Sequence, residues 1–313
     1  MTSTLEKPHL LIIGCGYVGL EVLRQCLASR NCSHHPLIGT AGSTASLDKI
    51  RQLGARAIRL DLDKQPEIEL PTGRWSLLYM VPPGRQSNED RRLARFLKVS
   101  TKRPPERVVY ISTSGVYGDR KGNLVDEEDE IAPATERAQR RADAEGKIRE
   151  FAAKHESAWL VLRVPGIYGP GRLRLPAIAR GEPVLRVEDC GPGNRIHRDD
   201  LAACCLRALQ TANCNRVINI SDDEHATSCA FATEVARQAG LPAPPRITAD
   251  EARQRFGAVR LSFLLESRLL DNTRMHRDLD VALRYPNMAT GIAASLVDSK
   301  TEDAAAGFPE KSG

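Results

Sequence analysis

The sequence predicts an α/β fold in which helices cover both faces of a parallel sheet. Short apolar runs recur along the chain and alternate with segments that have the apolar spacing of amphipathic helices. This alternation is typical of parallel sheets, because a parallel strand pair needs a long crossover connection. The first apolar run, residues 10–13, also leads into a glycine-rich turn before the first helix. The fold class rests on these two observations.

The glycine-rich turn has the spacing G-x-G-x-x-G, with Gly14, Gly16 and Gly19 between the first strand and a helix over residues 20–28. Gly14 permits a sharp turn, Gly16 lets a pyrophosphate approach the backbone, and Gly19 lets the helix pack closely on the sheet. The helix N-terminus offers free N–H groups and a partial positive charge to phosphates. The alternative is a strand–helix corner without a ligand. The strand–turn–helix context favours dinucleotide binding and a doubly wound, Rossmann-type sheet.

The remaining elements follow in order. Further strands are expected over residues 36–40, 57–60, 76–81, 107–111, 159–164 and 216–220, with an edge strand at 184–186. Helices are expected over residues 45–53, 89–97, 133–145, 173–181, 201–209, 227–240 and 271–279, and a final turn at 285–286 precedes residues 291–296. Parallel sheets of this kind bind ligands at the carboxyl ends of their strands. Gly14, Asp61, Pro82 and Ser112 would all lie there.

The end of the second strand bears on the choice between NAD and NADP. An acid there would bond the ribose 2′-hydroxyl of NAD, whereas a nearby arginine would favour the 2′-phosphate of NADP. The chain offers Thr40 and small residues after it, with neither an acid nor a nearby base. NADP is therefore slightly favoured and the choice stays open. Asp61 at the third strand end could accept from the adenine amino group or serve as a turn residue.

Composition is that of a soluble globular protein, with 41% hydrophobic and 27% charged residues. The formal net charge of +5 is small for 313 residues and gives little support to nucleic-acid or membrane binding. None of the eight cysteines forms a C-x-x-C pair, so zinc sites lack their usual spacing and no metal is expected. We expect a reduced, cytoplasmic protein, and no apolar segment before the first strand is long enough for a signal peptide or membrane span.

Three hydroxyl residues, Ser112, Thr113 and Ser114, follow the fifth strand directly. Buried hydroxyls need partners, and a substrate carbonyl or hydroxyl would be one. The alternative is a loop whose hydroxyls cap the local backbone.

Four motifs in order give the chain a family resemblance. They are the glycine motif, S-T-S-G-V-Y-G at 112–118, L-R-V-P-G-I-Y-G-P-G at 162–171 and R-I-H-R-D-D-L at 195–201. Together they resemble the extended short-chain dehydrogenase/reductases, the NAD-dependent epimerase/dehydratase family, over about residues 9–295. The resemblance implies a Rossmann domain with a smaller, mostly C-terminal substrate domain, and a homodimer through helices near 89–97 and 135–151.

The resemblance also implies a set of site residues. Thr113 holds the position of the catalytic Ser/Thr, with Ser114 beside it, and Arg195 would face the substrate. Pro165 and Gly166 would lie near the nicotinamide. The expected dinucleotide contacts are Gly14, Gly16, Tyr17, Val18, Gly19, Thr40, Asp61, Leu62, Val81, Pro82, Pro83, Ser112, Arg141, Pro165 and Gly166.

The family's acid/base signature Y-x-x-x-K is absent. With Glu145 matched to an acid usual in the family's helix, Arg137 falls on the Tyr position and Arg141 on the Lys position. An arginine stays charged and cannot shuttle the proton. Both guanidinium groups could instead hold an anionic ligand, and Arg141 the cofactor ribose. The alternative is a solvated helix with i,i+4 pairs from Glu145 to Arg141 and to Arg149. Tyr168 is a weak substitute acid.

The resemblance is greatest to a poorly characterised bacterial branch with a similarly Arg-rich helix, for which no substrate is assigned. We expect a Rossmann domain over residues 1–165, with 196–220 returning to it, a substrate domain over 166–296 and a disordered tail over 297–313. The leading hypothesis is an NAD(P)-dependent oxidoreductase or epimerase for a small anionic or sugar-like substrate. The alternative is a non-catalytic NAD(P)-binding sensor or scaffold, because the catalytic Tyr is missing.

Overall fold

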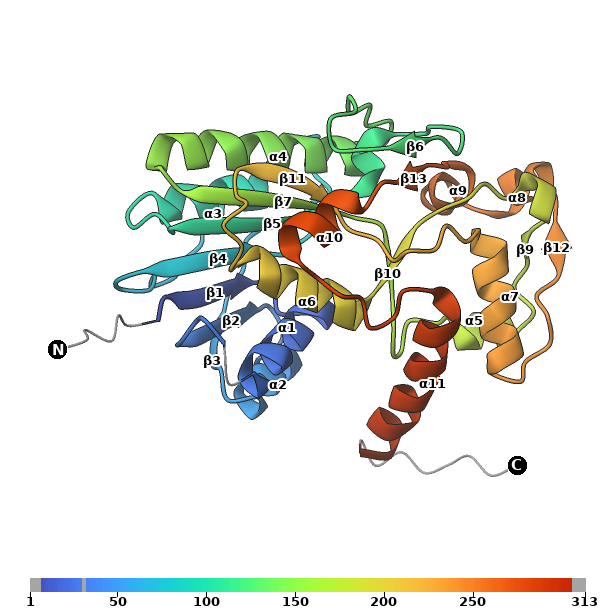
Figure 1. The fold of residues 1–313 in the computed structure, drawn as a ribbon, viewed down its shortest axis with the longest axis horizontal. Coiled ribbons are helices and arrows are strands. Elements are labelled where there is room, and N and C mark those ends of the chain that lie inside the picture. Colours follow the sequence, from blue (N-terminus) through green and yellow to red (C-terminus); the bar gives the residue numbers. More distant parts are fainter. Residues whose placement is uncertain (1–6, 30–31, 306–313) are drawn as a thin grey trace.

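A seven-stranded parallel sheet forms the centre of the computed structural model, which describes residues 7–29 and 32–305. Its strand order is β11-β7-β5-β4-β1-β2-β3 (Figure 1). The strands are β1 (His9–Ile13), β2 (Leu37–Ala41), β3 (Arg56–Arg59), β4 (Trp75–Tyr79), β5 (Arg107–Thr113), β7 (Ala158–Val164) and β11 (Arg216–Asn219). This order confirms the α/β, Rossmann-type class. Because the order reverses between β1 and β4, the ligand crevice of such a sheet lies at their carboxyl ends.

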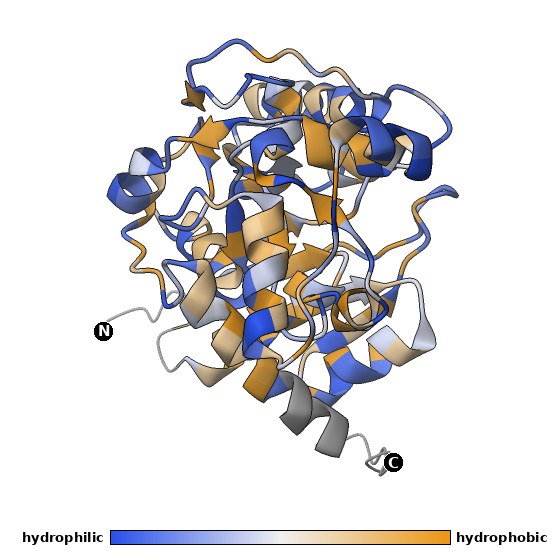
Figure 2. Cartoon of the chain, turned by 90° about the vertical axis from the view of Figure 1, so that its right-hand side faces the viewer, coloured by the Kyte–Doolittle hydropathy of each residue, from blue (hydrophilic) through white to orange (hydrophobic). Residues whose placement is uncertain are grey.

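Helices cover both faces of the sheet because successive strand residues point to opposite sides. Leu10 and Ile12 of β1 pack in one buried cluster with α1 (Tyr17–Ala28), α2 (Thr44–Gln52) and α6 (Arg198–Ala208). Leu11 and Ile13 pack in a second cluster with α3 (Arg91–Ser100) and α4 (Glu136–His155). Figure 2 shows the hydrophobic segments gathered among the strands, with hydrophilic segments on the outer loops and helices.

A smaller lobe lies beyond the carboxyl ends of the strands and contains α5, α7, α8, α9, β9 and β12 (Figure 1). The remaining elements of the chain are η1 (Ser114–Tyr117), β6 (Leu124–Val125), β8 (Gly166–Tyr168), α5 (Leu175–Ala179), β9 (Val184–Leu185), η2 (Val187–Asp189), β10 (Arg195–His197), α7 (Ser228–Gln238), β12 (Arg246–Ile247), α8 (Ala249–Arg255), α9 (Ala258–Leu265), β13 (Leu269–Leu270), α10 (Thr273–Leu279) and α11 (Met288–Ala305). The strands among them pair as β8 with β10, β9 with β12, and β6 with β13.

Three expectations from the sequence need correction. The edge strand at 184–186 is β9, which pairs with β12 rather than with the central sheet. The helix after residue 133 begins at Glu136 and continues to His155. Helix α11 continues to Ala305, so residues 297–305 are helical rather than a tail, and 306–313 lie outside the described residues.

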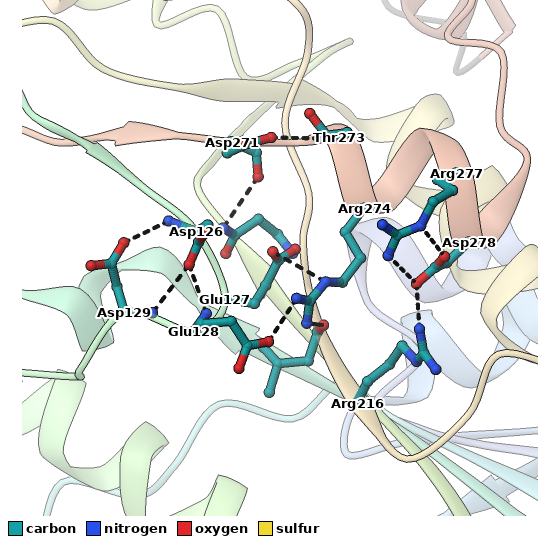
Figure 3. Close-up of polar contacts among 12 residues, drawn as sticks. Asp126, Glu127, Glu128, Asp129, Arg216, Asp271, Thr273, Arg274, Arg277 and Asp278 are labelled. Carbon is teal, nitrogen blue, oxygen red and sulfur yellow. Dashed lines mark hydrogen bonds and ion pairs between the residues drawn. The ribbon is translucent and has the colours of Figure 1, made fainter.

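An ion-pair network joins α10 to the outer strand β11 and to the acidic segment after β6 (Figure 3). Arg274 lies 2.7 Å from an Oε1 of Glu128 and 3.4 Å from Oε2 of Glu127. The other carboxylate oxygen of Glu127 accepts the backbone N–H of Asn219, at 2.7 Å. The segment after β6 is thereby bound to both helix α10 and strand β11.

The cysteines differ from expectation at one place. Cys26 and Cys32 form a disulfide with an S–S distance of 1.97 Å, so these two are not reduced in the structure. The other six thiols are free, and Cys204 and Cys205 are buried in α6 as small core residues. Among the described residues, no helix is both long and apolar enough to span a bilayer.

Candidate functional site

The glycine turn after β1 has the geometry that its sequence predicts. Gly14 has a φ of +97°, which L side chains rarely adopt, and a Cβ there would lie 2.7 Å from Val81. The Gly14 N–H donates to Oγ1 of Thr40, at 3.1 Å, so the buried Thr40 hydroxyl supports the turn from β2. A Cβ on Gly19 would lie 2.9 Å from the Gly14 carbonyl. The turn therefore requires glycine at both positions.

The N-terminus of α1 is open to a ligand. Gly16 is its N-cap, no side chain caps the helix, and nothing lies within 4 Å of a Cβ built on Gly16. Uncapped N–H groups and the helix dipole suit a pyrophosphate there. Val18 faces the core, whereas the Tyr17 hydroxyl donates to the Pro170 carbonyl at 2.9 Å. The turn thus fits the dinucleotide that the spacing predicts, and Tyr17 links it to the glycine-rich segment after β8.

A cavity of 310 Å³ lies beside the turn, at the ends of β2 and β3. It is lined by Gly14, Thr40, Ala41, Gly42, Arg59, Leu60, Asp61, Leu62, Asp63, Val81 and Arg92. The structure therefore brings together the predicted residues Gly14, Thr40, Asp61, Leu62 and Val81. Oδ1 of Asp61 accepts the Asp63 N–H at 2.9 Å, as expected of a turn residue. Asp61 also lines the cavity, and its contact with adenine stays a prediction.

Arg59 is one of the lining residues of this cavity that the sequence analysis missed. It ends β3 and lies in register with Ala41 of β2. Its guanidinium donates to the Gly42 carbonyl at 2.9 Å and to the Thr44 hydroxyl at 2.8 Å. A base therefore does stand beside the end of β2, contrary to the expectation. Strand register brings it there, and only the pairing of 37–41 with 56–59 could have revealed it.

A larger cavity of 690 Å³ lies at the ends of β4, β5 and β7, beneath the N-terminus of α4. It is lined by Pro82, Pro83, Arg85, Ile111, Ser112, Thr113, Thr135, Glu136, Arg137, Arg140, Arg141, Val164, Pro165, Ile167, Ala258, Ser262 and Phe263. Seven predicted site residues meet here: Pro82, Pro83, Ser112, Thr113, Arg137, Arg141 and Pro165. Gly166 follows Pro165 as the exposed first residue of β8 and does not line the cavity. We call this space the arginine cavity.

The three hydroxyls after β5 have different surroundings. Thr113 lines the arginine cavity, and its Oγ1 accepts the Gly115 N–H at 3.2 Å, which leaves the O–H free to donate to another group. Ser112 also lines the cavity but donates to Oε1 of Glu145, at 2.6 Å. Ser114 is buried in η1 and does not line the cavity. Thr113 is therefore the hydroxyl placed to meet a ligand.

Arg141 is anchored to the sheet through one nitrogen. Its Nη1 donates to the Tyr110 hydroxyl at 2.9 Å and to the Ile111 carbonyl at 2.7 Å. The i,i+4 pair with Glu145 considered for a solvated helix does not form, because Glu145 instead binds Arg163 at 2.8 Å. The Glu145–Arg149 pair does occur, at 3.5 Å. The Arg141 guanidinium is thus held at the cavity wall.

Arg137 has surroundings unlike those of its neighbours. Its guanidinium carbon lies 3.9 Å from the centroid of the Phe263 ring. No hydrogen bond or ion pair of its side chain occurs within the part of the chain that the structure describes. Arg140, by contrast, is buried and donates to the Ser87 carbonyl at 2.9 Å. Burial, together with the charges of Arg268 and other arginines nearby, lowers the pKa of Arg137.

Tyr168 is not brought to the arginine cavity. It is buried between the rings of His197 and Phe231, and its hydroxyl lies 3.5 Å from the Asn287 carbonyl. Burial raises its pKa far above that of an ordinary tyrosine. Tyr168 is the last residue of β8, and its side chain reaches α11, where a Cβ on Gly291 would meet the Tyr168 hydroxyl. Among the described residues that line the cavity, none is a tyrosine.

Arg195 lines a third, smaller cavity of 190 Å³ in the smaller lobe. Its Nη1 donates to the Ala226 carbonyl at 2.8 Å, and its guanidinium carbon lies 4.4 Å from the Phe231 ring centroid. Arg172, Arg174 and Arg260 also line this space. The expected substrate-facing arginine is therefore separate from the lining of the arginine cavity. It belongs to a second cationic pocket.

Comparison with known proteins agrees with this geometry. The model of the NAD dependent epimerase/dehydratase family matches residues 91–221, which include the hydroxyl segment, α4 and the strands β7 and β11. This part of the chain is therefore similar to that family. A search of curated proteins found no significant relative.

Solved structures resemble the whole chain. A functionally unknown conserved protein from Silicibacter pomeroyi is 28% identical, with a TM-score of 0.80 over 93% of this chain and 99% of that one. UDP-glucuronic acid 4-epimerase from Bacillus cereus, solved with NAD, is 16% identical, with a TM-score of 0.72 over 94% and 99%. dTDP-glucose 4,6-dehydratase from Bacillus anthracis, also with NAD, is 16% identical, with a TM-score of 0.72 over 95% and 97%. At this identity the two enzymes support the fold.

Proposed function

We propose that the protein binds a nicotinamide dinucleotide across the carboxyl ends of its strands and acts as an oxidoreductase or epimerase on a small molecule. The observation that carries this proposal is the arginine cavity. Thr113 and the anchored Arg141 line it together with Pro82, Pro83 and Pro165. The glycine turn and the 310 Å³ cavity lie at the carboxyl ends of other strands of the same sheet. Two enzymes of similar fold were solved with NAD, which supports the choice of cofactor.

The residues present suggest a division of labour. The dinucleotide supplies a hydride donor or acceptor when it is bound. Thr113 donates a hydrogen bond to the substrate oxygen and stabilises negative charge that develops there. Arg141 binds the cofactor ribose, because its two bonds to β5 fix the guanidinium in place. Since Tyr168 lies elsewhere, we propose that a water bound beside the substrate would take up or give the proton.

We further propose a preference for NADP. Arg59, which is held by Gly42 and Thr44, places a guanidinium at the end of β2, where residues 40–44 include no acid. A 2′-phosphate there would gain a charge-assisted hydrogen bond, worth about 1.5–3 kcal/mol. Arg59→Ala should therefore weaken NADPH binding about tenfold or more and leave NADH binding unchanged. Arg56→Ala, an exposed arginine of the same strand, is the control.

The alternative function is a sensor or scaffold that binds the dinucleotide without turnover. One observation favours it: Arg137 occupies the position of the family's catalytic Tyr. The described residues that line the cavity include no tyrosine that could replace it. It predicts dinucleotide binding with a change of shape or partner, and no hydride chemistry. Hydride transfer to or from any substrate, lost in Thr113→Ala, would exclude it.

The first experiment is a fluorescence titration of the purified protein with NADH and NADPH. Gly16→Val should abolish binding, because its side chain would occupy the open space at the N-terminus of α1. Gly146→Val is the matched control, since a Cβ on that glycine of α4 also meets nothing within 4 Å. Binding that survives in Gly16→Val, or no binding of either dinucleotide to the natural protein, would overturn the proposal.

A further inference from the structure

The first turns of α4 carry several positive charges, which are unfavourable at the N-terminus of a helix. Arg137, Arg140 and Arg141 all line the arginine cavity, and Glu136 is the only acid of the first turn. The N-terminal end of a helix carries a partial positive charge, so cations there are destabilising unless an anion is close. Local rules broken in this way mark functional sites more often than structural ones.

The arginines near Arg137 on α4, and Arg268, already have hydrogen-bond or ion-pair partners within the protein. Arg140 binds the Ser87 carbonyl and lies 3.4 Å from a carboxylate oxygen of Glu136. Arg141 binds a phenol and a carbonyl of β5. Arg268, the outer neighbour, binds Glu266 at 2.6 Å. Arg137 is a half-buried cation that contacts an aromatic ring and makes no direct ion pair among the described residues. The carboxylate nearest to it in effect, Glu266, is bound to Arg268.

Stacking on Phe263 leaves the binding edge of Arg137 available. A guanidinium that lies over a ring covers one planar face, whereas its N–H groups point outward in the plane. Those N–H groups form the fork that matches a carboxylate or phosphate. Phe263 itself is 63% exposed at the mouth of the cavity, so the ring holds the cation without closing the entrance.

We propose that Arg137 binds an oxyanionic group of the substrate, so that the substrate is a small hydroxy or oxo compound with a carboxylate or phosphate near its reacting carbon. This inference rests on the proposed function and names its substrate class. Thr113 lines the same 690 Å³ cavity and would bind the reacting oxygen. In this arrangement the residue at the Tyr position orients the substrate through its anion rather than through proton transfer.

Isothermal titration with two probe anions tests the proposal without a known substrate. Oxalate serves as the carboxylate probe and inorganic phosphate as the phosphate probe. Each is titrated with and without saturating NADPH. The natural protein should bind at least one of them, and Arg137→Ala should weaken that binding tenfold or more. Arg137→Lys should restore part of it, because a lysine keeps the charge but not the planar fork. Arg91→Ala, an exposed arginine at the start of α3, should bind like the natural protein.

The outcomes separate this proposal from the proposed function. Anion binding that is equal in Arg137→Ala and the natural protein overturns the inference, as does no anion binding while NADPH still binds. The anion that binds more tightly decides between a carboxylate and a phosphate. If the natural protein does not bind NADPH at all, the result instead counts against the proposed function. NADPH binding retained in Arg137→Ala shows that the variant is folded.

Discussion

The Ser112 hydroxyl lies 2.6 Å from Oε1 of Glu145, and this bond joins the wall of the arginine cavity to the core of the protein. Glu145 also accepts from Nε of Arg163 at 3.2 Å and from its Nη2 at 2.8 Å. Both charged side chains are almost fully buried. One carboxylate of α4 thus holds the ends of β5 and β7, from which Thr113 and Pro165 enter the site.

Removal of this carboxylate should be costly. Glu145→Ala leaves the buried Arg163 without its counter-ion, and we expect the free energy of unfolding to fall by about 3–5 kcal/mol. Urea denaturation followed by circular dichroism measures the change. Glu150→Ala, an exposed acid on the same helix, should alter stability by no more than about 0.5 kcal/mol. Equal midpoints for the two variants would contradict the structural role of Glu145.

Much of the central fold could be predicted from local sequence, because apolar periodicity and glycine spacing are local properties. The glycine turn, the parallel sheet and the position of Thr113 are examples. Features set by distant pairing could not be predicted in this way. Arg59 reaches the end of β2 only through strand register, and Val184–Leu185 finds its partner in β12.

The direction in which a side chain points could not be predicted from the sequence either. Tyr168 ends β8 in a segment that resembles a family motif, yet packing against Phe231 and His197 directs its hydroxyl toward Asn287. The pattern around Arg141 allowed either a solvated ion pair or a ligand contact. The bonds to Tyr110 and Ile111, which decide its position, join α4 to a strand far from it in sequence.

Arg141 should contribute to dinucleotide affinity. Its hydrogen bonds within the described structure use Nη1, and the residue lines the arginine cavity. Arg141→Ala should therefore weaken NADPH binding about tenfold or more, which fluorescence titration measures. Lys154→Ala, an exposed cation near the end of the same helix, should leave the affinity unchanged. The role in ribose binding would be wrong if both variants bound NADPH like the natural protein.

Tyr168→Phe should change neither ligand binding nor catalysis. The substitution removes only a hydroxyl that lies 3.5 Å from a backbone carbonyl, outside the cavity lining. NADPH affinity and the pH profile of any turnover should stay as in the natural protein, whereas Thr113→Ala should reduce turnover about a hundredfold. A shift of the pH profile in Tyr168→Phe would show that this tyrosine transfers the proton after all.

Asp222 should make stability depend on pH. Burial raises the pKa of its carboxyl to about 8, and its Oδ1 has no hydrogen-bond partner among the described residues. The unfolded chain has an ordinary aspartate pKa of about 3.9. Between these values the folded protein holds a proton that the unfolded chain has lost, so this carboxyl destabilises the fold progressively as pH rises from about 4 to about 8.

Asp222→Asn replaces the protonated acid with a neutral group of the same shape. Its advantage over the natural protein should grow from pH 5 to pH 8, reach a few kcal/mol and level off above that, as measured by urea denaturation at pH 5, 7 and 9. Asp250→Asn, at an exposed acid of α8, should show no such trend. A gain that is the same at every pH would mean that Asp222 is ionised in the folded protein throughout this range.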